Sequence, residues 1–305
     1  MEIVFFGTGP VAAASLESLA TNFSIELVIT KQAPAHHKGS VPVLEVTNRL
    51  GLAVEFANTK EELDQLMEDM IFESKVGVIV DYGVIVSKRV IDIFALGIIN
   101  SHFSLLPEWR GADPITFTIL SGQTETGVSL MKIVEALDEG QLIAQEKIEI
   151  TPNATTPSLT GMLIKKNNEM FKKFLDEYAS GNIVPYDQPD IPATYSRKLT
   201  KDDGILDWTK PAVQLEREIR GYIDWPKSRC VLAGKDVVIT KARSEQRAVS
   251  SEQGVEIGDA KVTPEKQLEI QTGDGVLIIE KLKPAGKPEM SVEAFLAGYG
   301  HLLSK

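Results

Sequence analysis

The 305-residue sequence contains a single cysteine, Cys230. One thiol cannot form an internal disulfide, and a cysteine-rich zinc site is also excluded. No stretch approaches the run of about eighteen apolar residues that predicts a transmembrane helix. Met1 is followed directly by a strand-like apolar segment without a basic region, so we expect no signal peptide. These absences predict a cytoplasmic protein without a membrane span.

The sequence also has no Gly-x-Ser-x-Gly motif, the turn that exposes the nucleophilic serine of α/β-hydrolases. Because Cys230 lies in a segment with a strand pattern, we expect no covalent nucleophile. There are only four histidines. Two of them, His36 and His37, are adjacent in a loop without nearby cysteines or a carboxylate cluster, which makes them poor metal ligands. We therefore expect no metal site.

The net charge of −11 is unevenly distributed. Residues 1–188 contain 14 Lys and Arg against 25 Asp and Glu, whereas residues 189–305 contain 18 of each kind. An acidic total argues against nonspecific nucleic-acid binding driven by bulk charge. A local basic patch is compatible with this total, and the C-terminal part is the better place for one.

Apolar runs alternate with helical patterns through the first 180 residues. This alternation predicts an α/β domain with a doubly wound, mostly parallel, Rossmann-like sheet. Gly7 and Gly9 follow the first strand, but they match only half of a dinucleotide-binding fingerprint. No acidic residue clearly follows the second strand, residues 25–29. The favoured interpretation is a tight turn that lets the next helix pack on the sheet.

The composition and the hydrophobic pattern of the sequence change after residue 188. Pro185, Pro189 and Pro192 lie in a stretch with few apolar residues, which predicts an interdomain linker that we place at residues 189–205. From residue 206 to 305, short alternating runs and hairpin signals predict a small β-barrel. We therefore expect a catalytic α/β domain at residues 1–188, the linker, and a C-terminal barrel domain.

A polar pair, Asn100 and His102, follows a buried strand. Residues two apart on a strand share a side, so both side chains should project together. Pro107 and Gly111 then open the strand into a shaped loop. Because ligands of open α/β sheets bind beyond the carboxyl ends of the strands, the pair is a candidate active site. The alternative is a histidine satisfied by backbone groups at the sheet edge.

A catalytic histidine needs an orienting partner. Asp138 is the best candidate, Asp81 is a rival and Glu135 a weaker one; a turn aspartate with local hydrogen bonds is the alternative role for Asp138. Asn, His and Asp without a nucleophile or metal suit direct acyl transfer to an amine. Asn100 and a protonated His102 could stabilise the oxyanion, and Asp138 could hold the imidazolium and assist proton removal.

Three sequence elements recur in order: Asn-x-His-x-Ser-Leu-Leu-Pro from Asn100, Trp-Arg-Gly-Ala from Trp109, and Leu-Asp-x-Gly from Leu137. In these elements the chain resembles the folate-dependent formyltransferases. Phe-Gly-Thr near the N-terminus, Trp225-Pro226 and residues 283–287 extend the resemblance over nearly the whole chain.

The resemblance implies transfer of a formyl group from 10-formyltetrahydrofolate, as co-substrate, to the α-amino group of methionine on initiator tRNA, in support of translation initiation. It implies that Asn100, His102 and Asp138 are the catalytic triplet, and that the C-terminal barrel is OB-like and helps to hold the tRNA. The residues expected to line the folate are Ser104, Leu105, Leu106, Pro107, Asp81, Tyr82 and Gly83. The candidate tRNA contacts are Lys38, Lys283 and Lys287.

Two other functions fit the pattern. One is formyl transfer to a sugar nucleotide, and the other is a non-catalytic module that binds folate or RNA, against which the intact triplet argues. The chain also departs from the family. Phe103 and Asp81 stand where small residues are usual, and Gln141 stands where an acidic one is usual. The loop at residues 31–42 looks shorter and less basic than the family's tRNA-contacting loop, which weakens the tRNA assignment more than formyl transfer.

Overall fold

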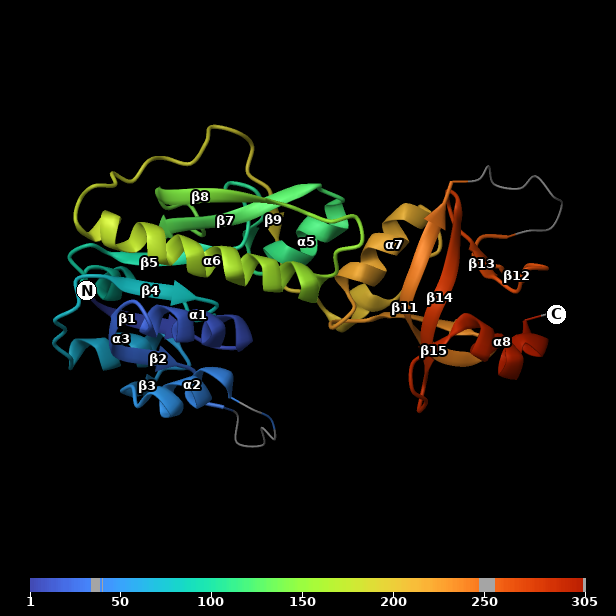
Figure 1. Ribbon diagram of the computed structural model, residues 1–305, viewed down its shortest axis with the longest axis horizontal. Coiled ribbons are helices and arrows are strands. Elements are labelled where there is room, and N and C mark those ends of the chain that lie inside the picture. The colour runs from blue at the N-terminus through green and yellow to red at the C-terminus, as the bar shows by residue number, and fades with distance from the viewer. Residues whose placement is uncertain (34–38, 40, 247–255, 304–305) are drawn as a thin grey trace. The chain divides into compact units, whose positions relative to one another are not determined.

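The computed structural model describes residues 1–33, 39, 41–246 and 256–303. Contacts divide the chain into two compact units (Figure 1). The N-terminal unit comprises Met1–Pro114, Glu125–Glu149 and Thr160–Ser196, and the C-terminal unit comprises Ile115–Thr124, Ile150–Leu159 and Arg197–Lys305. Among the described residues, no helix combines the length and apolar character needed to cross a membrane.

A seven-stranded sheet with strand order β3-β2-β1-β4-β5-β7-β8 forms the centre of the N-terminal unit. Its strands are β1 (Glu2–Gly7), β2 (Ser24–Thr30), β3 (Val54–Phe56), β4 (Gly77–Val80), β5 (Ile98–His102), β7 (Glu125–Lys132) and β8 (Leu142–Glu149). The first five strands pair in parallel, while β7 and β8 are antiparallel to their neighbours. The predicted mostly parallel α/β sheet is confirmed.

Helices cover both faces of this sheet (Figure 1). They are α1 (Pro10–Ala20), α2 (Pro42–Leu50), α3 (Lys60–Glu68), α4 (Lys88–Ile91) and α6 (Thr156–Ala179), whereas α5 (Pro114–Ser121) falls almost wholly in the C-terminal unit. On one face, Leu63 of α3 and Val90 of α4 pack in the same apolar cluster as Phe6 of β1. On the other face, the buried Asn167 of α6 donates a hydrogen bond of 3.0 Å to Ser15 of α1. Burial of both faces explains the continuous apolar runs of the strands.

The turn between β1 and α1 is a packing device. A Cβ atom at Gly7 would lie 2.6 Å from the Cβ of Ala12, so only glycine lets α1 approach the strand this closely. Thr8 Oγ1 donates a 2.6 Å hydrogen bond to the carbonyl of Asp81, in the loop after β4. The Asp81 carboxylate faces Gly9, so a phosphate bound at this turn would meet a negative charge. The structure therefore agrees with a tight packing turn rather than a dinucleotide site.

The proline-containing segment after α6 packs on the N-terminal unit. Tyr186 exchanges backbone hydrogen bonds of 2.8 and 2.9 Å with Leu142, and β9 (Tyr195–Ser196) pairs in parallel with β6 (Arg110–Gly111). Proline favours extended backbone, and an extended chain can pair with another segment as readily as it can span a gap. We call residues 186–196 the strap. The expected linker, residues 189–205, is divided between the two units after Ser196.

A six-stranded antiparallel sheet forms the barrel-like C-terminal unit. Its strand order is β10-β11-β14-β13-β12, with β15 paired to β14. The strands are β10 (Ser228–Leu232), β11 (Lys235–Glu245), β12 (Ala260–Val262), β13 (Leu268–Gln271), β14 (Val276–Pro284) and β15 (Met290–Ser291). Helices α7 (Ala212–Gly221) and α8 (Val292–Tyr299) bury Leu215 and Phe295 against Ile239 and Leu282 of this sheet. The short strands and hairpins predicted from the sequence are confirmed.

Candidate active site

Strand β5 carries Asn100 and His102 at its carboxyl end. Asn100 is in register with Ile79 of the parallel strand β4 and with Met131 of the antiparallel strand β7. Hydrogen bonds on both sides therefore fix the backbone of β5. His102 is buried, with 6% of its surface exposed, and Asn100 is half-buried. The pair lies at the carboxyl edge of the parallel strands, as the sequence predicts.

The hydrogen bonding of His102 defines its tautomer. Nε2 lies 2.9 Å from the carbonyl oxygen of Trp109, and a carbonyl oxygen can only accept, so Nε2 carries the hydrogen. In the neutral ring Nδ1 is then a free acceptor. Burial lowers the pKa of His102, although the charge of Asp138 and the Trp109 carbonyl act in the opposite direction. The resting ring is therefore neutral, and the protonated form expected from the sequence must arise during the reaction.

Asp138 lies beside the free nitrogen of this ring. Its Oδ2 is 3.8 Å from Nδ1 of His102, too long for a direct hydrogen bond but close enough for an ion pair. The same oxygen accepts a 2.7 Å hydrogen bond from the backbone N–H of Gly111. The φ angle of Asp138 is 52°, a left-handed conformation that aspartate tolerates better than most residues. No described contact joins His102 to the rival carboxylates Asp81 and Glu135.

Asn100 completes the group. Among the described residues, its carboxamide makes no hydrogen bond, so both N–H donors are available to a ligand. His102 therefore offers a neutral base beside the carboxylate of Asp138, and Asn100, two residues earlier on β5, offers a free donor. This set can remove a proton from an amine while it stabilises an oxyanion.

The turn after β5 is held by polar side chains beneath it. Ser129 Oγ donates to the carbonyl of Ser104 at 2.7 Å and accepts from the N–H of Leu106 at 3.1 Å. Gln145 donates to the carbonyl of Leu106 at 3.0 Å. Ser104, Leu106 and the following proline are buried, and only Leu105 is partly exposed. The predicted folate-lining turn can therefore offer a ligand the Leu105 side chain and backbone groups.

The second predicted folate-lining segment follows β4, where the strand order reverses between β1 and β4. The Tyr82 ring is buried and its hydroxyl donates to the carbonyl of Ala57 at 3.2 Å, so only its backbone can face a ligand. Asp81 and Gly83 are exposed. Although Asp81 reaches solvent, the protein atoms crowded around its carboxyl raise its pKa to about 6. Phe103 follows β5 and stands where the family usually has a small residue. It is buried, with 7% of its surface exposed.

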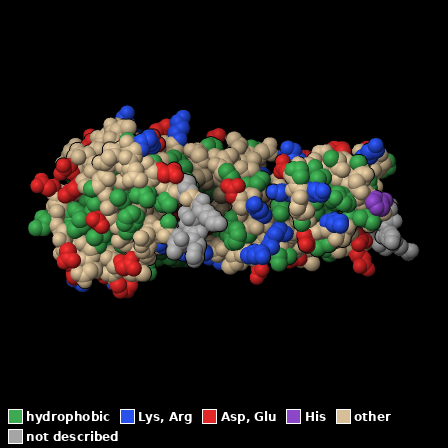
Figure 2. Space-filling model, turned by 90° about the horizontal axis from the view of Figure 1, so that it is seen from below, with side chains coloured by type: hydrophobic (Ala, Val, Ile, Leu, Met, Phe, Trp, Pro, Cys, Tyr) green, Lys and Arg blue, Asp and Glu red, His purple; other side chains and the backbone are tan. Residues whose placement is uncertain are grey.

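Two of the predicted tRNA contacts, Lys283 and Lys287, belong to the C-terminal unit. Lys283 is at the end of β14 and Lys287 is in the turn after it, and both are exposed. Lys38, like the neighbouring His36 and His37, lies outside the described residues. Figure 2 shows Lys and Arg side chains gathered over the C-terminal unit. This distribution agrees with the more balanced charge of that part of the sequence.

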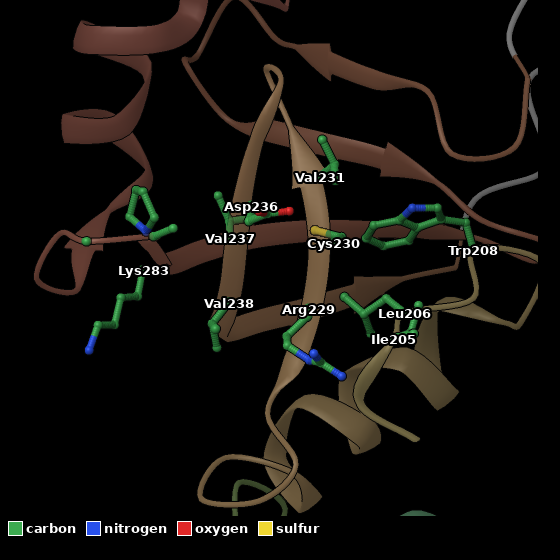
Figure 3. Close-up of a pocket in the computed structure, with 13 residues that line it drawn as sticks. Ile205, Leu206, Trp208, Arg229, Cys230, Val231, Asp236, Val237, Val238 and Lys283 are labelled. Carbon is green, nitrogen blue, oxygen red and sulfur yellow. The ribbon is translucent and has the colours of Figure 1, made fainter. Parts of the chain in front are cut away.

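A hollow of about 770 Å³ lies in the C-terminal unit (Figure 3). The Trp208 ring points toward Cys230, and Lys283 extends away from both. Burial raises the pKa of Cys230 to about 12, so its thiol stays protonated and is a poor nucleophile. The wall contains no member of the triplet. We therefore place the reaction at β5, not in this hollow.

Two functional contacts were not expected from the sequence. They are the carbonyl of Trp109, which receives the His102 hydrogen, and the N–H of Gly111, which holds Asp138. Every residue has these backbone groups, so residue types cannot reveal them. The only available signal was the Trp-Arg-Gly-Ala motif itself, to which no role could be given.

The chain was compared with known proteins. Residues 1–175 match the formyl transferase family, and residues 198–300 match the formyl transferase C-terminal domain. The chain is 34% identical over 312 residues to the methionyl-tRNA formyltransferase of Listeria monocytogenes serotype 4a, covering 100% of this chain and 97% of that one. It is 34% identical over 294 residues to the methionyl-tRNA formyltransferase of Roseiflexus castenholzii, covering 94% and 92%.

A solved structure shares the fold. The sugar 3N-formyl transferase WlaRD, whose crystal structure was determined in the presence of dTDP and 5-N-formyl-THF, has a TM-score of 0.68 at 19% identity. The likeness covers 94% of this chain and 99% of that chain.

Proposed function

The chain belongs to the methionyl-tRNA formyltransferase family of formyl transferases, and from this premise we propose that it formylates initiator Met-tRNA. The formyl donor is 10-formyltetrahydrofolate, the acceptor is the α-amino group of methionine, and the reaction serves translation initiation in the cytoplasm. One observation carries the proposal: Nδ1 of His102 lies 3.8 Å from Oδ2 of Asp138, and the uncommitted carboxamide of Asn100 comes two residues before His102 on the same strand.

The reaction proceeds by direct attack. The amine nitrogen forms a bond to the formyl carbon, and the carbonyl oxygen becomes an oxyanion to which Asn100 donates a hydrogen bond. Nδ1 of the neutral His102 accepts the amine proton, and the resulting imidazolium is stabilised by Asp138 and can itself donate to the oxyanion. The tetrahedral intermediate collapses by breaking the bond from carbon to N10 of tetrahydrofolate. The proton then passes to N10.

In this proposal, the folate lies beyond the carboxyl ends of β1 and β4. Two features support the placement. Ligands of doubly wound sheets bind where the strand order reverses, and Asp81 and Gly83 are exposed at that point. Leu105, in the turn after the strand that carries Asn100 and His102, is partly exposed and could contact the folate. In this placement, the Asp81 carboxylate would accept hydrogen bonds from N–H groups of the pterin.

One assay tests the function. The protein is incubated with 10-formyltetrahydrofolate and either initiator Met-tRNA or a set of amino-sugar nucleotides, and the formylated products are separated. Formyl-Met-tRNA is expected. Formylated sugar nucleotides without formyl-Met-tRNA would contradict the proposal and favour a sugar-nucleotide enzyme. Folate binding without turnover of either acceptor would indicate a binding module.

The KM for tRNA should depend on salt. Each phosphate contact releases a counterion, so two or more contacts raise KM by about tenfold or more between ~50 and ~200 mM salt. Replacing Lys283 with alanine should reduce the slope of log KM against log salt by about one. Lys75→Ala, at an exposed lysine before β4, is the matched control and should leave the slope unchanged. A KM that is flat across the salt series would count against tRNA as the acceptor.

A further inference from the structure

The backbone of Asp138 is held by a residue outside the triplet. Gln188, in the strap, donates from Nε2 to the carbonyl of Asp138 at 2.7 Å and to the carbonyl of Gly140 at 3.0 Å. Its carboxamide oxygen accepts a 2.8 Å hydrogen bond from Nη2 of Arg110. The carbonyls can only accept and the guanidinium can only donate, so the orientation of the amide is defined by its partners. The amide nitrogen of Gln188 therefore donates to two carbonyls of the Asp138 loop, and its oxygen accepts from Arg110.

Arg110 binds both Gln188 and the residue that follows Asp138. Its side chain is only 12% exposed, and Nη1 pairs with Glu139 at 2.8 Å while Nη2 binds Gln188. Glu139 is the residue after Asp138. Arg110 binds the side chain of Glu139, and Gln188 binds the carbonyls of Asp138 and Gly140. Because Arg110 and Gln188 also bind each other, together they hold the loop that carries Asp138.

The strap also holds the backbone that contacts the triplet, which includes the Trp109 carbonyl and the Gly111 N–H. The carbonyl of Thr194 accepts from the N–H of Arg110 at 2.9 Å, and Thr194 Oγ1 accepts from the N–H of Trp109 at 2.8 Å. These bonds fix residues 109–111, whose backbone holds His102 and Asp138. A Cβ at Gly111 would overlap the carbonyl oxygen of Ser196, which shows how closely the strap approaches.

Such support is needed because Asp138 is in a left-handed conformation with φ of 52°. A non-glycine residue in this region is less stable than in the extended or right-handed regions, and it persists only where its surroundings impose it. Without Gln188, the loop could relax and carry the carboxylate away from His102. A displacement of about 1 Å at a reacting group can reduce turnover by about a hundredfold.

We propose that Gln188 is a positioning residue for the reaction: its two donors hold the Asp138 loop so that the carboxylate faces His102. The inference rests on the proposed function for its catalytic consequence, but the positioning itself can be measured without turnover. It also gives the strap a role in the active site beyond that of a connection between the units.

The test compares Gln188→Ala with Gln141→Ala. Gln141 also binds the strap, through a 3.0 Å hydrogen bond to Asp187, but it does not touch Asp138, so it is the matched control. In Gln188→Ala we expect kcat to fall about tenfold or more, with KM for both substrates within twofold and the melting temperature within a few degrees. Gln188→Glu keeps the Arg110 contact and loses both donors, so its kcat should fall at least as far.

Hydrogen exchange gives the readout that is independent of activity. The Gly111 amide donates to the Asp138 carboxylate, so NMR should show its exchange accelerating about tenfold in Gln188→Ala and not in Gln141→Ala. The Arg110 amide, bound to Thr194, should stay protected in both. Unchanged Gly111 exchange, or full activity in Gln188→Glu, would overturn the positioning role. A wild-type protein that makes no formyl-Met-tRNA overturns the proposed function instead, and Gly111 exchange still decides whether Gln188 positions Asp138.

Discussion

Replacement of His102 by alanine is expected to lower kcat by about a hundredfold or more, because the variant lacks the group that accepts the amine proton. The measurement is formation of formyl-Met-tRNA under saturating substrate. His102→Gln should be equally impaired while it keeps an N–H donor for the Trp109 carbonyl, which separates lost chemistry from lost packing. His301→Ala, at an exposed histidine of the C-terminal unit, is the control and should retain activity.

Activity within about tenfold of the wild type in both His102 variants would remove this residue from the chemistry. Such a result would favour the structural alternative, in which the buried ring only satisfies the carbonyl of Trp109. Melting temperatures belong to the same experiment, since a loss of fold in the alanine variant alone would leave the glutamine variant as the deciding measurement.

The charge state of His102 can be measured directly. Burial lowers its pKa, so an NMR titration of the ring should give a midpoint below the usual value of about 6.5. The folded protein then binds fewer protons at this ring than the unfolded chain, and His102 makes stability fall as the pH drops below about 6.5. A midpoint above the pH of the assay would mean that the ring is mostly charged at rest and cannot act first as the base.

The sequence was sufficient to place the catalytic strand because its two signals are local. A buried apolar run identifies a strand, and period two puts Asn100 and His102 on one side of it. The pairing of His102 with Asp138 was harder to predict, since they are 36 positions apart in the sequence and three carboxylates competed. The resemblance to a family favoured Asp138, and the 3.8 Å separation in the folded chain agrees with that choice.

The strap shows what could not be predicted. Its prolines and few apolar residues are equally typical of a free linker and of an extended segment that pairs with an edge. The contacts of Tyr186, Gln188 and Thr194 distinguish the two, and most of them are made to backbone groups, which residue types do not mark. For the same reason, the contacts of the Trp109 carbonyl and the Gly111 N–H could not be predicted. Side-chain chemistry was therefore readable from the sequence, whereas the backbone support that orients it was not.

Asp138→Asn should reduce kcat by about a hundredfold while the protein stays as stable as the wild type. Asparagine tolerates the left-handed conformation of this position, and its side-chain oxygen can still accept the hydrogen bond from Gly111. The substitution therefore removes the negative charge and little else. Turnover and melting temperature are measured together, with Asp187→Asn, at an exposed aspartate of the strap, as the control.

Comparison with Asp138→Ala divides the two roles of this residue. Alanine removes the charge and also the acceptor for Gly111, and it strains the left-handed backbone, so the melting temperature should fall in this variant and not in Asp138→Asn. If the charge stabilises the imidazolium, both variants lose turnover to a similar degree. If Asp138→Asn is active and only Asp138→Ala is not, the carboxylate serves as a loop anchor, and the charge that stabilises His102 in the reaction must come from elsewhere.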